Sequence, residues 1–461
     1  MTATWIRALA RRLVGAALAC GVLFGAAGQA HAQSLIRDAE IEQSLRVYTE
    51  PLLTAAGLNP GDVHLYVVND PSINAFVAGG QNIFVHTGLI LAADTPNEVI
   101  GVLAHETGHI AGGHLARNRE AMNQSLGAAL ISIGLGVIAM AAGAPDAGAV
   151  LISGSQGIAM GNFVRHTQVQ ESAADQAATQ YLEATGQSGR GLIDFFNKNI
   201  RPYEFAVRRA PPWMMTHPFS SDRVESLRQR VTAGAHYDTP EDADFVRRLA
   251  FMQAKLVGFI QSEGQTLARY PISDTSQPAR YARAVAYYRA SQLPRARAEL
   301  DSLIAEDPRN PYFQELMGQI LFENGRAAES LPFHARALDL APNEPLLQIN
   351  LARALNTAQG RAGSERAMSL LRQAIDREPD NAFAWRELAV AHDLRGEQSL
   401  AELASAEQNF ALGDFGAALS FAERARRNLP RNTPDYQRAL DIATFAGQEM
   451  RDRAEQRGRS G

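Results

Sequence analysis

Cysteine is almost absent: the chain of 461 residues has a single thiol, at Cys20. That residue lies in a stretch with three arginines, an apolar run over Leu13–Ala27 and an A-x-A site ending at Ala32, the pattern of a cleaved secretory leader. The run is short for a retained membrane anchor, and Ala17 stands where a lipoprotein leader carries a large aliphatic residue. We therefore predict a signal peptide over 1–32, after which the mature chain has no disulfide and no cysteine nucleophile.

A dominant charge of one sign is also lacking. The formal net charge is −5 at pH 7, and it becomes −8 when the leader, with three arginines and no acidic residue, is removed. No block of basic residues offers the patch that nucleic acids require, so nucleic acid is excluded as a partner. An exported chain without thiols suits a bacterial periplasm, and we expect the protein there.

The histidines divide the mature chain into two parts. Eight of the ten that follow the leader lie in 33–236, whereas the stretch from about 277 onward is rich in Ala, Arg and Leu and holds two. A chain of this length is too long for one core, so more than one domain is expected. We predict a first domain over 33–265, a linker over 266–276, and a second domain from 277.

Prolines in the second part recur at the spacing of a helical repeat. Pro308, Pro342 and Pro379 each close a run of two amphipathic helices and are 34 and 37 residues apart. The tetratricopeptide repeat, a stacked helix pair, has a period of about 34 residues. We predict an all-α solenoid of such repeats over 277–433, closed by a capping helix and tail over 434–461. Arrays of this kind bind peptide or protein segments and carry no chemistry of their own.

The last repeat departs from this period. Pro430 lies 51 residues after Pro379, and Gly396 and Gly413 are 17 residues apart. The excess equals half a repeat. We therefore expect the helix near 398–412 to be the second helix of one pair and the first helix of the next.

The first part begins with strand signals and then changes to a helix. Segments 62–70, 73–80 and 81–90 alternate apolar and polar residues between Pro, Asn and Gly turns, which is typical of strands. The sequence Thr95-Pro96-Asn97-Glu98 then predicts a helix start with a capping box. This combination favours an α+β domain, mostly helical with a small sheet.

The helix that starts there carries the sequence HETGH. His105 and His109 are four residues apart, so both rings project from one face and can hold one zinc ion. Glu106 is placed to take a proton from a metal-bound water. The flanking residues are apolar, which argues against a solvated surface helix. The pattern predicts a zinc metallopeptidase centre.

A catalytic zinc ion of this type needs a third protein ligand. His114 is one residue short of the longer H-E-x-x-H-x-x-G-x-x-H pattern, and we expect it to be an ordinary polar residue where the helix ends. In QESAADQAATQYLEATG, Glu171 and Asp175 share a helix face among small apolar residues. We predict Glu171 as the third ligand and Asp175 as the group that holds the ring N–H of a ligating histidine.

Five motifs occur in the order of a known family. They are NAFVAGG (74–80), FVHTGLI (84–90), HETGH (105–109), ESAAD (171–175) and THPFSSDR (216–223). The chain resembles the M48 family of zinc metallopeptidases and, with its leader and repeats, the members that act in outer-membrane protein quality control. The resemblance implies an endopeptidase with one zinc ion per chain, held by His105, His109 and Glu171, with Glu106 as catalytic base.

The resemblance also implies a substrate-binding strand. Asn74, Ala75 and Phe76 would form an exposed sheet edge on which an extended substrate could lie, bound through its backbone. His217 is implied to lie near the metal, as an oxyanion donor or as a fourth ligand that keeps the enzyme inactive; a structural role is the alternative. Arg223 could support the oxyanion or pair with Glu171 and Asp175, with or without a catalytic part.

The stretch 121–164 is apolar, and its only charge is Asp146. Its two arms are Leu126–Ala142 and Gly148–Gly161, and the second is too short to span a bilayer comfortably. We expect a helical hairpin beside the cleft that packs partly on the domain and can make a peripheral membrane contact.

Two functions follow from these observations. The first is a periplasmic zinc endopeptidase that cuts misassembled or misfolded exported and outer-membrane proteins, with the repeats docking clients or the outer-membrane assembly machinery. The second is a chaperone-like adaptor in which binding dominates over proteolysis. The presence of Glu106 favours the first, because a structural zinc site needs no base.

Overall fold

The computed structural model describes residues 35–117, 167–199, 217 and 221–460. The predicted signal peptide and the predicted apolar hairpin lie outside these residues. Within the described ranges, no helix is both long enough and apolar enough to cross a membrane.

The predicted strands form a four-stranded sheet in the order β1-β2-β4-β3. The strands are β1 (Leu35–Ile36), β2 (His64–Val68), β3 (Ala75–Ala78) and β4 (Asn82–His86). β2 and β4 are parallel, and the flanking pairs are antiparallel. Gly79 and Gly80 turn the chain between β3 and β4 with φ of +59° and +104°, values that L side chains rarely adopt. β3 is therefore an edge strand of the described sheet.

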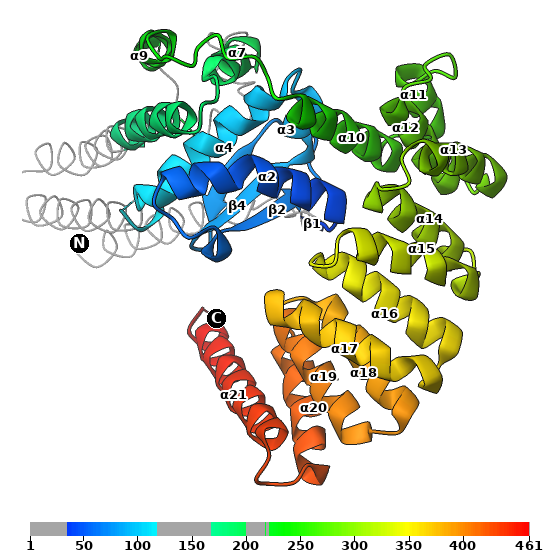
Figure 1. Ribbon diagram of the computed structural model, residues 1–461. Helices are drawn as coiled ribbons and strands as arrows, with labels where there is room; N and C mark the ends of the chain where they lie inside the picture. The colour runs from blue at the N-terminus through cyan, green and yellow to red at the C-terminus, as the bar shows by residue number, and fades with distance from the viewer. Residues whose placement is uncertain (1–34, 118–166, 200–216, 218–220, 461) are drawn as a thin grey trace, which may run out of the picture.

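One face of the sheet is covered by helices and forms the first core (Figure 1). The helices are α2 (Ala39–Ala55), α3 (Thr87–Ala92) and α4 (Pro96–Ala111). The short 3-10 turn η1 (Pro60–Asp62) lies between α2 and β2. Val67 and Val85 from the sheet pack with Leu45 of α2 and Leu103 of α4, and all four are essentially inaccessible to solvent. The α+β class predicted for this domain is confirmed.

Three more helical segments complete the first domain. They are residues 167–184, α7 (Arg190–Asn199) and α9 (Ser221–Thr232). α7 lies against α4 at Gly101, where an added Cβ would stand 2.7 Å from the Cβ of Leu192. This glycine lets the two helix backbones approach closely, and α4 is buried on several sides as a result.

Helix α10 (Ala243–Ile260) belongs to both halves of the molecule. Its Leu249, Met252 and Leu256 pack in the first core, whereas Phe251 and Ala254 pack in the core of the repeats. The segment predicted as a linker includes the second half of α11 (Glu263–Arg269). The domain boundaries stay a prediction.

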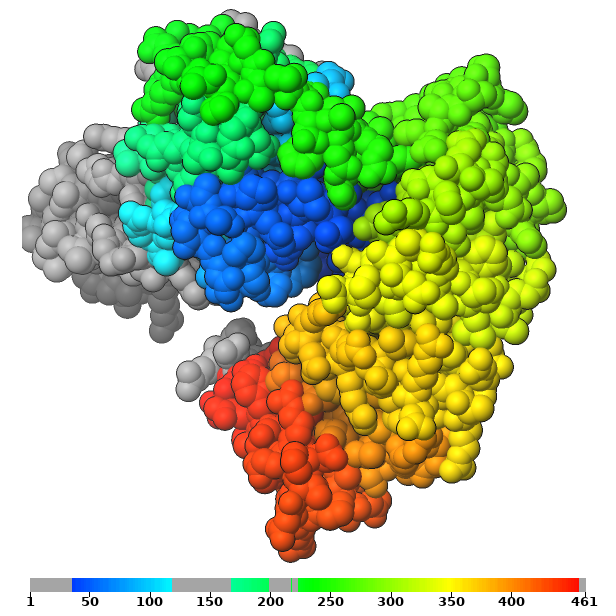
Figure 2. Space-filling model, in the orientation of Figure 1, coloured from blue at the N-terminus to red at the C-terminus, as the bar shows by residue number. Residues whose placement is uncertain are grey.

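Helix pairs follow, as the fold-class prediction required. They are α12 (Gln277–Arg289), α13 (Leu293–Glu306), α14 (Pro311–Glu323), α15 (Ala327–Leu340), α16 (Pro345–Gln359), α17 (Arg361–Arg377), α18 (Ala382–Arg395), α19 (Gln398–Ala411), α20 (Phe415–Asn428) and α21 (Pro434–Ser460). α19 packs against both α18 and α20, as the other helices of the array pack against their neighbours, and its predicted place in two successive pairs stays a prediction. The array curves so that α21 turns back toward the first domain (Figure 1), and open space separates the two in Figure 2.

Candidate metal centre

Helix α4 starts where the sequence predicted, but without the predicted capping box. Thr95 is the N-cap residue and Pro96 follows at the first helical position, yet the Thr95 side chain makes no capping hydrogen bond. The Glu98 carboxylate instead lies 3.7 Å from the Lys198 ammonium group, on the neighbouring α7. The capping-box prediction was wrong because the Glu98 carboxylate takes a backbone hydrogen bond at Asp94 and not at the N-cap residue Thr95.

The two histidines of the HETGH sequence project from the same face of α4 toward one point. The Nε2 atoms of His105 and His109 are 3.0 Å apart. His105 is fully buried, and the side chain of His109 is 12% exposed. Two imidazole nitrogens facing each other at this distance in a dry environment have the spacing of donors to a shared cation.

Glu171 comes from the helical residues 167–184, which cross α4 at a glycine. An added Cβ at Gly108 would stand 2.9 Å from the carbonyl oxygen of Ala174, closer than real contacts allow. The glycine within HETGH therefore lets this helix approach, which places the Glu171 carboxylate 3.4 Å from His105 Nε2 and 3.3 Å from His109 Nε2. Sequence reasoning did not assign Gly108 this role.

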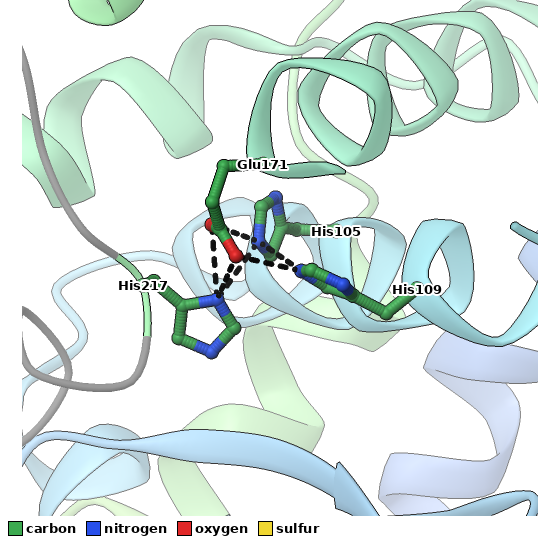
Figure 3. A group of neighbouring side chains, drawn as sticks. All are labelled: His105, His109, Glu171 and His217. Carbon is green, nitrogen blue, oxygen red and sulfur yellow. Dashed lines mark hydrogen bonds and ion pairs between the residues drawn. The ribbon is translucent and has the colours of Figure 1, made fainter. Parts of the chain in front are cut away.

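His217 is the fourth member of the group (Figure 3). Its Nδ1 lies 3.1 and 3.2 Å from the two carboxylate oxygens of Glu171 and 3.3 Å from His105 Nε2. It is 5% exposed. Donor atoms of all four residues lie within 4.8 Å of one another, and Figure 3 shows the three rings converging on the carboxylate.

A layer of polar groups surrounds these four. Asp175, one helical turn after Glu171, places its Oδ1 2.9 Å from His105 Nδ1. Arg223 of α9 donates to both oxygens of Asp175, from Nε at 2.5 Å and from Nη2 at 2.9 Å. Its Nη1 lies 2.8 Å from Glu171 Oε2. Of the roles considered for Arg223, the structure shows the pairing with both carboxylates.

The electrostatics favour bound positive charge. Burial disfavours ionisation, but hydrogen bonds from the three histidines hold the pKa of Glu171 far below its usual range. Against the same effect of burial, Arg223 lowers the pKa of Asp175 to about 2. Burial lowers the pKa of His109 and His217, so both are neutral near pH 7 and keep a lone pair. Bonds to Asp175 and Glu171 overcome burial at His105 and raise its pKa to about 9, which means that the metal-free protein holds a proton there.

Glu106 is buried without compensation. It is 0% exposed, and within the described residues neither of its carboxylate oxygens accepts a hydrogen bond. Burial raises its pKa to about 7. His217 Nε2 lies 3.5 Å from Glu106 Oε1. A carboxylate held in this way is suited to exchange a proton near neutral pH.

The remaining candidates lie close by. Asn74 and Ala75 are buried, while Phe76 is half-buried and stacks on Phe84 with ring centroids 5.1 Å apart. β3, which contains Ala75 and Phe76, packs against α4. His114 is also near the centre, although sequence reasoning treated it as an ordinary polar residue. Its Nδ1 lies 3.0 Å from His109 Nδ1.

Comparisons with known proteins agree with this arrangement. Residues 39–231 match the model of peptidase family M48. The chain is 28% identical over 385 residues to the beta-barrel assembly-enhancing protease of Yersinia pestis, which covers 82% of this chain and 77% of that protein. For the protein of the same name from Escherichia coli K12, the identity is 28% over 400 residues, with 85% and 80% covered.

Two further likenesses cover parts of the chain. Metalloprotease LoiP of Escherichia coli K12 is 28% identical over 207 residues, which is 44% of this chain and 75% of LoiP. Among solved structures, YrrB, described as a TPR protein with an unusual peptide-binding site, aligns with a TM-score of 0.32 and 16% identity over 38% of this chain and 91% of YrrB.

The family match covers β2, β3, β4, α4 and the helices that carry Glu171 and Arg223. The buried histidines and carboxylates described above lie inside the matched region. The region of this chain that is similar to peptidase family M48 is therefore the region that holds the candidate metal centre.

Proposed function

We propose that this protein is a zinc-dependent endopeptidase, with His105, His109 and Glu171 as metal ligands. The observation that carries the proposal is the set of donor separations, 3.0–3.4 Å between the ring nitrogens and carboxylate oxygens. A tetrahedral zinc ion with bonds of about 2.0–2.1 Å keeps its ligand atoms about 3.3 Å apart. The donor types, imidazole nitrogen and carboxylate oxygen, also suit zinc.

The charge balance supports a divalent cation. Glu106, Glu171 and Asp175 are buried together with one permanent cation, Arg223, so the ionised set lacks two positive charges. Buried charge without a counterion is costly. A divalent ion removes that cost, whereas the metal-free protein must keep protons in the centre.

Different residues of this chain would take different roles in peptide hydrolysis. When bound, the zinc ion polarises the scissile carbonyl and lowers the pKa of water. Glu106 accepts the proton of the attacking water and later donates it to the leaving amine. Asp175 fixes the tautomer of His105, and Arg223 holds Asp175 and Glu171 in place. The backbone N–H and C=O groups of the edge strand β3 can pair with an extended substrate of any amino-acid sequence.

His217 completes a fourth donor position, and we infer that it keeps the resting enzyme inactive. Three protein ligands would leave one position for water, but His217 Nδ1 lies as close to Glu171 and His105 as the other donors do. Substrate binding would have to move His217 before Glu106 can act. We therefore assign His217 the role of a fourth metal ligand at rest and not that of an oxyanion donor.

The proposed setting is the periplasm, with the leader removed after Ala32. The clients would be misassembled outer-membrane proteins, which are rich in extended segments, and the repeats would dock them or the assembly machinery. The names of the relatives from Yersinia pestis and Escherichia coli support this setting. Peripheral membrane contact through 121–164 belongs to the same proposal.

The test is metal content together with casein cleavage, for the mature chain and for Glu106→Gln. We expect about one zinc ion per chain in both proteins and cleavage only in the first. Cleavage that survives in Glu106→Gln would refute the assigned base. Metal binding without cleavage in these two proteins and also in His217→Ala would favour the chaperone-like adaptor instead.

A further inference from the structure

Each histidine of the candidate centre has one ring nitrogen facing the other donors and one facing away. For His105 the outer nitrogen, Nδ1, faces Asp175 Oδ1 at 2.9 Å. For His109 the outer nitrogen, also Nδ1, faces Nδ1 of His114 at 3.0 Å. The two ligands of α4 therefore have different outer partners, one a carboxylate and the other an imidazole.

The chain is built to hold His114 in this place. α4 ends at Ala111, and Gly113 follows with a φ of +61°, which turns the backbone back on itself. An added Cβ at Gly112 would stand 2.4 Å from His114 Nε2, so only glycine leaves room for the returning ring. The rings of His109 and His114 meet edge to face, with centroids 4.9 Å apart and planes at 80°.

Burial restricts the ring further. His114 is 4% exposed, so its Nδ1 has little access to water. A buried ring nitrogen at hydrogen-bond distance from another must donate or accept, because an unmade bond there is costly. His109 Nε2 faces Glu171 and His105, and its lone pair is needed on that side. The proton of His109 therefore belongs on Nδ1, and His114 Nδ1 is the acceptor.

We propose that His114 is a positioning residue for His109: it accepts the Nδ1–H bond, fixes the tautomer and turns Nε2 toward the metal. This inference rests on the proposed metal centre. The choice of imidazole has a physical reason, because three carboxylates are already buried here and a fourth at this position would add uncompensated negative charge. A neutral acceptor orients His109 without that cost.

The experiment separates the hydrogen bond from the packing of the ring. His114→Phe keeps a ring of similar shape and loses the acceptor, whereas His114→Asn keeps an acceptor oxygen near the position of Nδ1 and loses the ring. Zinc affinity is measured by competition with a chelator, on the mature chain. Cobalt-loaded protein gives a visible spectrum that reports ligand geometry. Thermal melts show whether each variant is folded.

We expect His114→Phe to bind zinc about 10–100-fold more weakly and to change the cobalt spectrum. His114→Asn should stay close to the unaltered chain in both, and so should His236→Phe, which removes a half-buried histidine outside the centre. Unchanged affinity in His114→Phe, or a loss in His114→Asn as large as in His114→Phe, would overturn the inference. His105→Ala distinguishes the two proposals: if it binds zinc normally, the metal centre itself is wrong.

Discussion

Two clusters of charged side chains in this molecule have the same carboxylates-to-cation ratio but different partners. The metal centre combines Glu106, Glu171 and Asp175 with Arg223. The second cluster, called here the Lys255 cluster, consists of Asp38, Glu40, Glu315 and Lys255. Each holds three carboxylates around one permanent cation, but only the metal centre adds histidines.

The Lys255 cluster relieves its excess negative charge with protons. Lys255 Nζ lies 2.8 Å from Asp38 and 3.5–3.6 Å from Glu40 and Glu315. Burial raises the pKa of Glu40, and it raises the pKa of Glu315 to about 7. Tyr281 donates a hydrogen bond to Glu40 at 2.9 Å. In the metal centre, by contrast, Glu171 and Asp175 are held ionised. The two clusters differ in their donors: imidazole nitrogens that can bind a metal surround the carboxylates of the metal centre, whereas a lysine ammonium group lies among those of the Lys255 cluster.

The largest effect is expected from removing a ligand of the metal centre. His105→Ala should lose zinc and lower casein cleavage by at least about 10³-fold, because the metal supplies several kcal/mol of transition-state stabilisation. Zinc content and cleavage are the measurements here, because the urea midpoint of the metal-free protein should also fall when Asp175 and Glu171 lose the His105 proton. Zinc retained by His105→Ala at normal affinity would contradict the ligand assignment.

A change of similar kind in the Lys255 cluster should affect stability instead. Lys255→Met leaves buried Glu40 and Glu315 and half-buried Asp38 without their cation and should destabilise the protein by about 3–5 kcal/mol in urea unfolding. Zinc content should stay at about one per chain. Arg326→Met removes an exposed ion pair with Glu329 and serves as the control, with no measurable change expected. An equally small effect in both variants would show that Lys255 is dispensable.

The next variant, His217→Ala, tests the fourth donor of the metal centre, which has no counterpart in the Lys255 cluster. If His217 closes the fourth position at rest, the open form is a minor state of about 10% or less, and the variant should cut casein at least about tenfold faster. Zinc content should not change. A fall in rate of about 10²–10³-fold would identify an oxyanion donor instead, and an unchanged rate would leave His217 a structural residue.

The smallest effect concerns pH. The folded chain keeps a proton on Glu315 up to a pKa of about 7, whereas the unfolded chain loses it near the ordinary value of 4.5. Between these values the folded state binds more protons, so this contribution to stability falls as pH rises. Glu315→Gln should therefore match the unaltered chain near pH 4 and exceed it at pH 8, by on the order of 1 kcal/mol.

Five titratable groups face Glu315 or the Lys255 ammonium group beside it. They are Asp38, Glu40, Lys255, Tyr281 and Tyr312. The measurement is the urea midpoint of both proteins between pH 4 and pH 8. A constant difference between the two across this range would contradict the assigned proton on Glu315.

The sequence predicted more of the metal centre than of the Lys255 cluster. His105 and His109 are linked by helical periodicity, and Glu171 and Asp175 by the same spacing on a second helix. Asp38 and Glu315 are joined only through tertiary packing across the whole chain, and no local pattern pairs them. The contact between His109 and His114 was missed because it depends on a tight turn at Gly113, not on a helical face.

The fold itself was predictable where one period dominates. Proline and glycine spacing predicted the stacked helices of the second domain. Single side-chain contacts were less predictable: Thr95 makes no side-chain cap, and the Glu98 carboxylate takes a backbone hydrogen bond at Asp94 and lies 3.7 Å from Lys198 of α7. Helical periodicity identifies the residues that share one face of a helix. A capping hydrogen bond or an ion pair depends instead on which residue the tertiary fold brings into contact.

Helix α10 has a mechanical consequence. Because Leu249 and Met252 are buried in one core and Phe251 and Ala254 in the other, the repeats cannot swivel relative to the peptidase domain without opening a core. A client docked on the repeats would therefore be held at a fixed distance from Glu106. We expect the cut site to be chosen by distance along the client: residues inserted between docking segment and cut site should shift the cleavage position by the inserted length, as mass spectrometry of the fragments can measure.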